Sequence, residues 1–193
     1  AASLFAIGFP GLYVAIAAFH TEMLPTSFLL SIATARTGIV IPVALEVLLM
    51  EFQFELLKEA GIHLPGQLGG TIGIVGLIVG QAAVEAGIVS TIVVIVVSFT
   101  AIASFIVPNE SFGAVFRLLK FLFIVTAAIW GIYGYLLTFA ALLLHLSQIE
   151  SFGVPYMLPS VCGENLNYDD KKDHYVRYPF AYMKKRPVFT REG

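Results

Sequence analysis

Long apolar stretches without a charged residue divide the chain. Residues 1–19, 64–84, 86–107 and 121–144 contain no Asp, Glu, Lys or Arg. A helix needs about 20 consecutive, mainly apolar residues to cross a bilayer, and each stretch comes near that length or exceeds it. The pattern therefore predicts an all-α, polytopic integral membrane protein with about four hydrophobic spans or re-entrant helices.

The second apolar stretch is rich in glycine. When it is projected on a helix, with about 100° between successive residues, its glycines gather on one side: Gly69, Gly73, Gly76 and Gly80. Small residues let helix backbones approach closely in lipid, where no hydrophobic effect drives association. This side is therefore predicted to pack against other helices.

The opposite side of the same helix carries sparse polar groups among apolar ones. Its candidate pore-lining residues are Thr71, Val75, Ile78, Gln81 and Glu85. An ionisable side chain within a membrane normally faces an aqueous path or a protein partner, so this face suits a pore wall with Glu85 near one mouth. The alternative is that Thr71, Val75 and Ile78 face lipid while Glu85 lies at the membrane interface.

A charged helix is predicted between the first two apolar stretches, over residues 39–60. Glu51, Glu55 and Glu59 fall on one face of this helix, and Glu46 lies nearly opposite. We expect the charged face to lie in water, either because the helix rests on the membrane surface or because it lines a wet cavity. In the second case Glu51, Glu55 and Glu59 are candidates for a cation-attracting vestibule.

Charge divides the chain into a membrane domain, residues 1–149, and a polar, basic tail, residues 150–193. The chain has 11 Lys and Arg and 13 Asp and Glu, and 13 of these 24 charged residues lie after Ser147. Seven of those 13 are Lys or Arg, which predicts a cytoplasmic tail by the positive-inside rule. Four strictly alternating spans would then place Arg117 and Lys120 outside, against the same rule. Either one apolar stretch is re-entrant, or the short helix that bears these two cations is buried in protein.

Composition agrees with a membrane protein and gives no sign of an enzyme. Hydrophobic residues make up 58% of the chain and charged residues 12%, against about 25% charged in a typical soluble domain. A net charge of -2 offers nothing to attract nucleic acid. His20 and Glu22 have the H-x-E spacing of a zinc deaminase, but the P-C-x-x-C partner is absent. Cys162 is the only cysteine, so we expect no disulfide, metal site or cofactor.

The start of the chain is uncharged. It begins at Ala1, without an initiator methionine and without the basic flank of a signal peptide. We expect Ala1 to lie inside or near a membrane span, in a fragment whose natural sequence continues N-terminally into a water-soluble domain.

Five blocks of sequence follow one another along the chain. They are LYVAI to HTEMLP (residues 12–25), EVLLME to EAGI (46–62), GQAAVEAG (80–87), SFIVP (104–108) and SFGVPY (151–156). Together they resemble the membrane domain of GerA-type A subunits of spore germination receptors. The resemblance covers nearly the whole chain, although the polar tail after Pro159 departs from the family's pattern. A sister group active late in sporulation shares most of these blocks.

The resemblance implies a subunit of a nutrient-responsive receptor in the inner membrane of the bacterial endospore, with receptor B and C subunits as partners. It also implies a ring-shaped homo-oligomer in the lipid bilayer that conducts ions. We therefore predict an oligomeric, nutrient-gated ion channel that releases cations during germination. A secondary transporter or a non-conducting structural subunit of the receptor complex is the alternative. No inverted internal repeat is visible in the sequence to favour a transporter.

Overall fold

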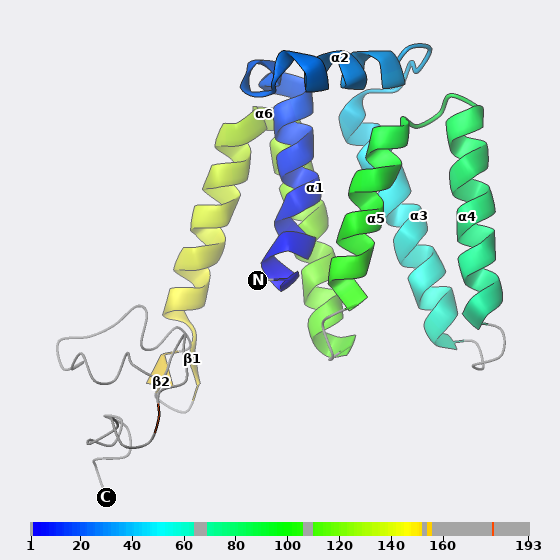
Figure 1. Cartoon of the computed structure of the whole chain (residues 1–193). Coiled ribbons are helices and arrows are strands. Elements are labelled where there is room, and N and C mark those ends of the chain that lie inside the picture. The colour runs from blue at the N-terminus through cyan, green and yellow to red at the C-terminus, as the bar shows by residue number, and fades with distance from the viewer. Residues whose placement is uncertain (1, 64–68, 106–109, 152–153, 156–178, 180–193) are drawn as a thin grey trace, which may run out of the picture. The chain divides into compact units, whose positions relative to one another are not determined.

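The computed structural model describes residues 2–63, 69–105, 110–151, 154–155 and 179 (Figure 1). These residues form six α-helices, one short 3₁₀ helix and one pair of two-residue strands. The all-α fold class predicted from the sequence is therefore confirmed. The chain divides into two compact units, residues 1–138 and residues 139–193.

The helices follow the apolar stretches closely. Their bounds are α1 Ala2–Phe19, η1 Thr21–Met23, α2 Thr26–Ala35, α3 Val43–His63, α4 Gly69–Glu85, α5 Thr91–Phe105 and α6 Glu110–Gln148. The chain turns between α4 and α5 at Gly87, whose φ of 66° favours glycine. For that reason α5 begins several residues later than the apolar stretch that predicted it.

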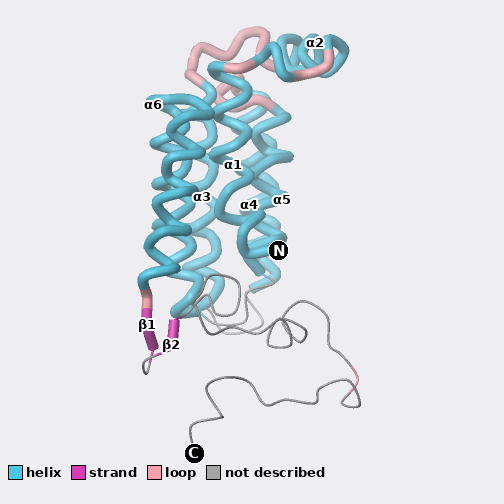
Figure 2. The backbone as a smooth tube through the Cα atoms, turned by 90° about the vertical axis from the view of Figure 1, so that its left-hand side faces the viewer, coloured by secondary structure: helices cyan, strands magenta, loops and turns pink. Residues whose placement is uncertain are grey.

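Helices α1, α3, α4 and α5 lie side by side, and α2 crosses the ends of α1, α3 and α5 (Figures 1 and 2). α5 packs against α1 and α3, and α3 also contacts α1 and α4. Their shared core is built from small and β-branched side chains, among them Val14, Val47, Val93, Ile124 and Ala127, all fully buried. Short side chains allow these helices to pack closely along their length.

α6 is a helical hairpin rather than one straight helix. Gly131 has φ 61° and ψ -140°, a conformation that is open to glycine and strained for other residues. The chain reverses there. This is shown by a hydrogen bond of 2.9 Å that the Thr138 hydroxyl donates to the Thr126 hydroxyl, although the two residues are twelve positions apart in the sequence. The sequence predicted a short helix that bears Arg117 and Lys120 and, after it, a separate span over 121–144. Both were wrong in their bounds, because the first limb runs unbroken to the reversal inside the predicted span.

Several helices have the length or the composition of membrane helices. Within the described part of the chain, Gly113–Gln148 is the one helical stretch that by length and composition could cross a membrane, and the reversal at Gly131 divides it into two limbs. Shorter apolar helices include Leu4–Phe19, Gly73–Glu85 and Thr91–Phe105. α3 has 21 residues, which at 1.5 Å per residue gives about 31 Å. That length is close to the hydrocarbon thickness of a bilayer, about 30 Å.

The second unit holds the end of α6 and a small antiparallel strand pair. β1 (Glu150–Ser151) pairs with β2 (Val154–Pro155), with Glu150 opposite Pro155. The predicted tail begins here. Cys162 and the basic run Lys184 to Arg186 lie outside the described residues.

Candidate functional site

α3 turns its charged side inward and its apolar side outward. Glu46 and Glu51 are fully buried, and Glu55 is 7% exposed. The exposed side carries the large apolar residues Leu45, Leu49, Phe52 and Leu56. The sequence predicted a water-facing stripe at Glu51 and Glu55. That prediction was wrong, because other helices supply cations that compensate the two carboxylates inside the bundle.

Lys120, from the first limb of α6, bridges two of these carboxylates. Its Nζ lies 2.6 Å from Glu51 Oε2 and 2.7 Å from Glu55 Oε1, and the residue is only 5% exposed. Thr100 of α5 donates its hydroxyl to the other Glu51 oxygen at 2.8 Å. Both Glu51 oxygens therefore have a partner, as a buried carboxylate requires.

Arg117 continues the pairing by one helical turn. Its Nε lies 3.0 Å from Glu55 Oε2, and its Nη2 lies 3.0 Å from Glu59 Oε2. The Glu59 side chain is 47% exposed, so the series runs from the interior toward the surface. We call Glu51, Glu55, Glu59, Arg117 and Lys120 the charge ladder. It joins α3 to the first limb of α6.

Glu46 forms a separate buried pair near the start of α3. Its Oε1 accepts a hydrogen bond from Arg36 Nη2 at 3.1 Å, and its Oε2 accepts one from the Ser90 backbone N–H at 2.9 Å. Arg36 also donates to the Ile41 carbonyl at 3.2 Å. These contacts tie together the segment after α2, the start of α3 and the start of α5.

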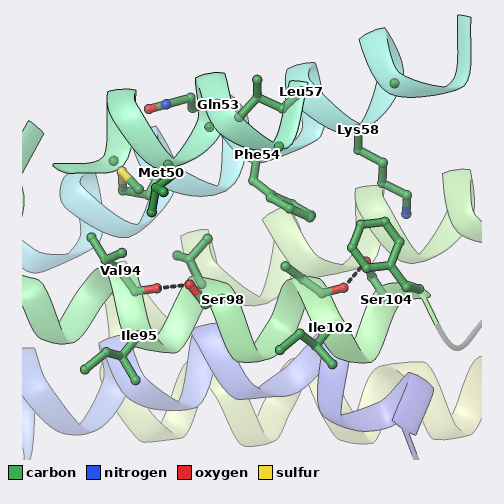
Figure 3. A pocket seen from close by; sticks show the side chains of 18 of the residues that line it. Met50, Gln53, Phe54, Leu57, Lys58, Val94, Ile95, Ser98, Ile102 and Ser104 are labelled. Atoms are coloured by element: carbon green, nitrogen blue, oxygen red, sulfur yellow. Dashed lines mark hydrogen bonds between the residues drawn. The ribbon is translucent and has the colours of Figure 1, made fainter. Parts of the chain in front are cut away.

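A cavity of about 1480 Å³ lies between α3, α4, α5 and the start of α6. Most of its wall is apolar, and polar groups are spread along it, with Gln53 near one end and Lys58 and Ser104 at the other. Figure 3 shows Met50 at the same end as Gln53. The Lys58 ammonium lies 5.8 Å from the centre of the Phe105 ring, a distance suited to a cation–π contact.

The glycine side of α4 faces this cavity. Gly73, Gly76 and Gly80 all line it. A Cβ at Gly76 would lie 3.1 Å from Leu57 of α3, whereas one at Gly73 or Gly80 would meet nothing within 4 Å. Among these three glycines, only Gly76 therefore lies in close contact with a side chain of another helix. Gly69 begins α4, and its surroundings are outside the described part of the chain.

The predicted pore-lining residues lie on the open sides of α4. Val75 and Ile78 are 45% and 58% exposed, and neither lines the cavity. Gln81 and Glu85 are exposed as well, and both border the cavity. Thr71 belongs to α4, but the structure does not describe its side chain. Within the described chain, these faces are free to meet lipid or another molecule.

No role in a site was predicted for the two cations of the charge ladder, Arg117 and Lys120. Their spacing carried a signal. Arg117 and Lys120 are three residues apart and the glutamates are four residues apart, and either spacing places side chains on one face of a helix. Protein burial of their helix was one of the two explanations left open, and the structure selects it for Lys120. No comparable signal along the chain pointed to Thr100 or Ser90.

The structure places His20 and Glu22, which have the H-x-E spacing, in different surroundings. His20 Nδ1 lies 3.4 Å from the Ala15 carbonyl oxygen. The His20 ring packs edge-on against the Tyr133 ring, with 6.3 Å between the ring centres. Glu22 is exposed on the 3₁₀ helix η1. The two residues belong to the turn that follows α1.

Comparison with known proteins gives one consistent result. A protein-family model described as Bacillus/Clostridium GerA spore germination protein matches residues 1–189. The chain is 41% identical over 187 residues to spore germination protein GerLA of Bacillus cereus, covering 96% of this chain and 37% of that protein. It is 45% identical over 177 residues to spore germination protein A1 of Bacillus subtilis, covering 91% and 36%.

A third relative carries a name that refers to its location. The chain is 43% identical over 183 residues to YfkQ of Bacillus subtilis, described as an uncharacterized membrane protein, covering 94% of this chain and 35% of YfkQ. The chain thus spans about a third of the length of the curated relatives it matches. No solved structure matches it.

Proposed function

Because the chain belongs to the Bacillus/Clostridium GerA spore germination protein family, we propose that it is the membrane part of an A-type subunit of a germinant receptor. In this proposal the receptor lies in the inner membrane of the endospore and contains B and C subunits beside this one. The finer proposal is that copies of the subunit form a ring that opens an ion pathway when nutrient is sensed.

The observation that carries the membrane location is the orientation of α3. In water, a helix that buries three glutamates and exposes leucine and phenylalanine would leave its apolar side unsolvated. In a bilayer the same helix is well placed, because lipid contacts the apolar side while the carboxylates meet cations inside the protein. A length near 30 Å and the apolar helices around it support the same conclusion.

α4 supports the channel proposal. Its glycine side faces the rest of the chain, while Val75 and Ile78 are exposed on its other side. In a ring of subunits these two side chains would form an apolar constriction that blocks ions by dewetting. Glu85 would favour cations at one mouth. Glu59, half-exposed at the end of the charge ladder, is the remaining candidate for a vestibule.

Val75→Ala tests this proposal. The smaller side chain should widen the constriction, so that spores release cations without nutrient, measured by ion release with the protein level checked. Leu77→Ala is the matched control, because Leu77 is 61% exposed but lies about 160° around the helix from Val75 and about 100° from Ile78. Wild-type ion release from Val75→Ala spores would show that this face of α4 does not form the gate.

A carrier is the second candidate, and the cavity beside α3 is the observation that favours it. Its volume and its mix of apolar wall and few polar groups suit a small organic molecule. Cation flux that runs down its gradient without substrate would support the channel. Flux that requires a co-transported substrate would support the carrier. A structural subunit without conduction would show neither.

A further inference from the structure

α2 differs from the other helices in orientation. Figure 1 shows it lying across the end of the bundle at α1, α3 and α5, and Figure 2 shows it projecting sideways beyond the helices beneath it. It packs against α5. At its end, Arg36 is anchored to Glu46 at 3.1 Å. A helix held crosswise at the end of a membrane bundle lies parallel to the membrane plane.

The two sides of α2 differ in chemistry. Ser27, Ser31 and Thr34 share an arc of about 60°, all three are exposed, and Ile32, buried to 8%, lies on the far side of the helix. The hydroxyls of Ser31 and Thr34 donate to the carbonyls of Ser27 and Leu30 at 3.0 and 2.9 Å. The polar side therefore faces away from the bundle.

The apolar side extends past the core contact. Phe28 lies about 40° from Ile32 around the helix, yet it is 46% exposed. Leu29, on the other flank of Ile32, is half-buried. Since α2 projects beyond the bundle, these apolar side chains have more surface than the protein beneath them covers.

Aromatic residues mark the same end of the molecule. The turn at Gly131 lies against the end of α1, since a Cβ there would be 3.1 Å from Phe19. Trp130 and Tyr133 flank this turn and are 59% and 75% exposed. Exposed Trp and Tyr are typical of the membrane–water boundary, where an apolar ring and a polar group each find a suitable environment.

We propose that α2 is an in-plane helix at the membrane–water boundary, with the phospholipid interface as its partner. Phe28 and Leu29 enter the acyl region beneath the headgroups, while the hydroxyl side faces water. α2 carries no charged residue, so its binding does not depend on anionic lipid. The proposal rests on the membrane location proposed above and not on ion conduction.

The test uses the full-length protein in phosphatidylcholine vesicles, with Cys162 and any other cysteine replaced by serine. Spin labels are attached at Ser31→Cys, at Phe28→Cys and at Leu137→Cys, a position that is 67% exposed on the second limb of α6. Collision with oxygen reports hydrocarbon, and collision with a water-soluble nickel chelate reports water. The oxygen-to-nickel ratio should be at least about threefold higher at Phe28 than at Ser31, and unchanged when phosphatidylglycerol is added.

Two results would overturn the proposal. Equal, water-like collision rates at Phe28 and Ser31 would place α2 away from the membrane. Protection of Phe28 from both reagents would show that protein covers it instead. The Leu137 label distinguishes a failure of the α2 proposal from a failure of the proposed membrane location. If the label at Leu137 is not accessible to oxygen, the membrane location itself is contradicted.

Discussion

Lys120 holds two carboxylates that solvent does not reach. Its contacts with Glu51 and Glu55 are 2.6 and 2.7 Å long, and all three side chains are buried. A charge taken out of water is tolerated only when an opposite charge or several hydrogen bonds replace the lost hydration. Removing one partner therefore lowers the free energy of unfolding by more than the intact pair contributes to it.

We predict that Lys120→Met destabilises the protein by about 3–5 kcal/mol, because it leaves Glu51 and Glu55 buried without their shared cation. The measurement is the thermal unfolding midpoint of the detergent-solubilised protein. Lys58→Met is the control, because the contact that the structure gives for Lys58 is with the Phe105 ring, worth about 1 kcal/mol or less. Equal shifts in the two variants would contradict a special role for the ladder.

At the scale of elements, the reversal in α6 depends on one glycine. Gly131 combines a positive φ with close neighbours, since a Cβ would lie 3.1 Å from Phe19 and 3.2 Å from the His20 ring. Backbone strain and steric overlap therefore act together at this position. Without the reversal, the two limbs of α6 could not pack against each other through Thr126 and Thr138.

Gly131→Ala should destabilise the hairpin by about 1–3 kcal/mol from the positive-φ backbone alone, and by more if Phe19 cannot move. Gly113→Ala is the matched control, because that glycine lies in the same helix, a Cβ there would meet nothing within 4 Å, and alanine should raise the helix propensity. Thermal unfolding of both variants decides the point. If Gly131→Ala is as stable as Gly113→Ala, the reversal does not require glycine.

α3 shows how an element's role depends on its neighbours. The same helical pattern could rest on a membrane surface with its glutamates in water, or cross the membrane with its glutamates against cations. In the structure the buried glutamates meet cations and the leucines face outward, which favours the second arrangement. In that arrangement lipid would contact one side of the helix and α6 the other.

At the scale of the whole molecule, the first unit buries Glu46, Glu51, Glu55 and Lys120 and exposes much apolar surface. Its exposed apolar side chains include Leu45, Phe52, Ile78, Ile102 and Leu118, each more than half exposed. So much apolar surface is unsuited to water and suited to lipid or to neighbouring subunits. This distribution is consistent with the membrane location proposed for the chain.

The basic tail leads to a prediction about orientation. By the positive-inside rule, its seven Lys and Arg predict a cytoplasmic tail. Cys162 should then react with a membrane-impermeant thiol reagent only after cells are permeabilised, which is measured by labelling intact and permeabilised cells in parallel. Labelling of Cys162 in intact cells would reverse the proposed topology.

Local sequence was enough to predict where most helices lie and what medium suits them. Uncharged runs of nearly bilayer length predicted α1, α4 and α5, because such runs are stable as helices in lipid and unusual elsewhere. The five sequence blocks predicted the family that the comparison later showed. These are properties of residues close together in the chain.

Where the charged groups point became clear only from the packed helices. A helical projection places Glu51, Glu55 and Glu59 on one face, but it cannot say whether water or a cation meets them. The answer came from Lys120, 69 residues from Glu51 and 65 from Glu55, and from Thr100, 49 residues from Glu51. Pairing at that distance in sequence exists only once the helices have packed, because it depends on where α5 and the reversing α6 bring their side chains.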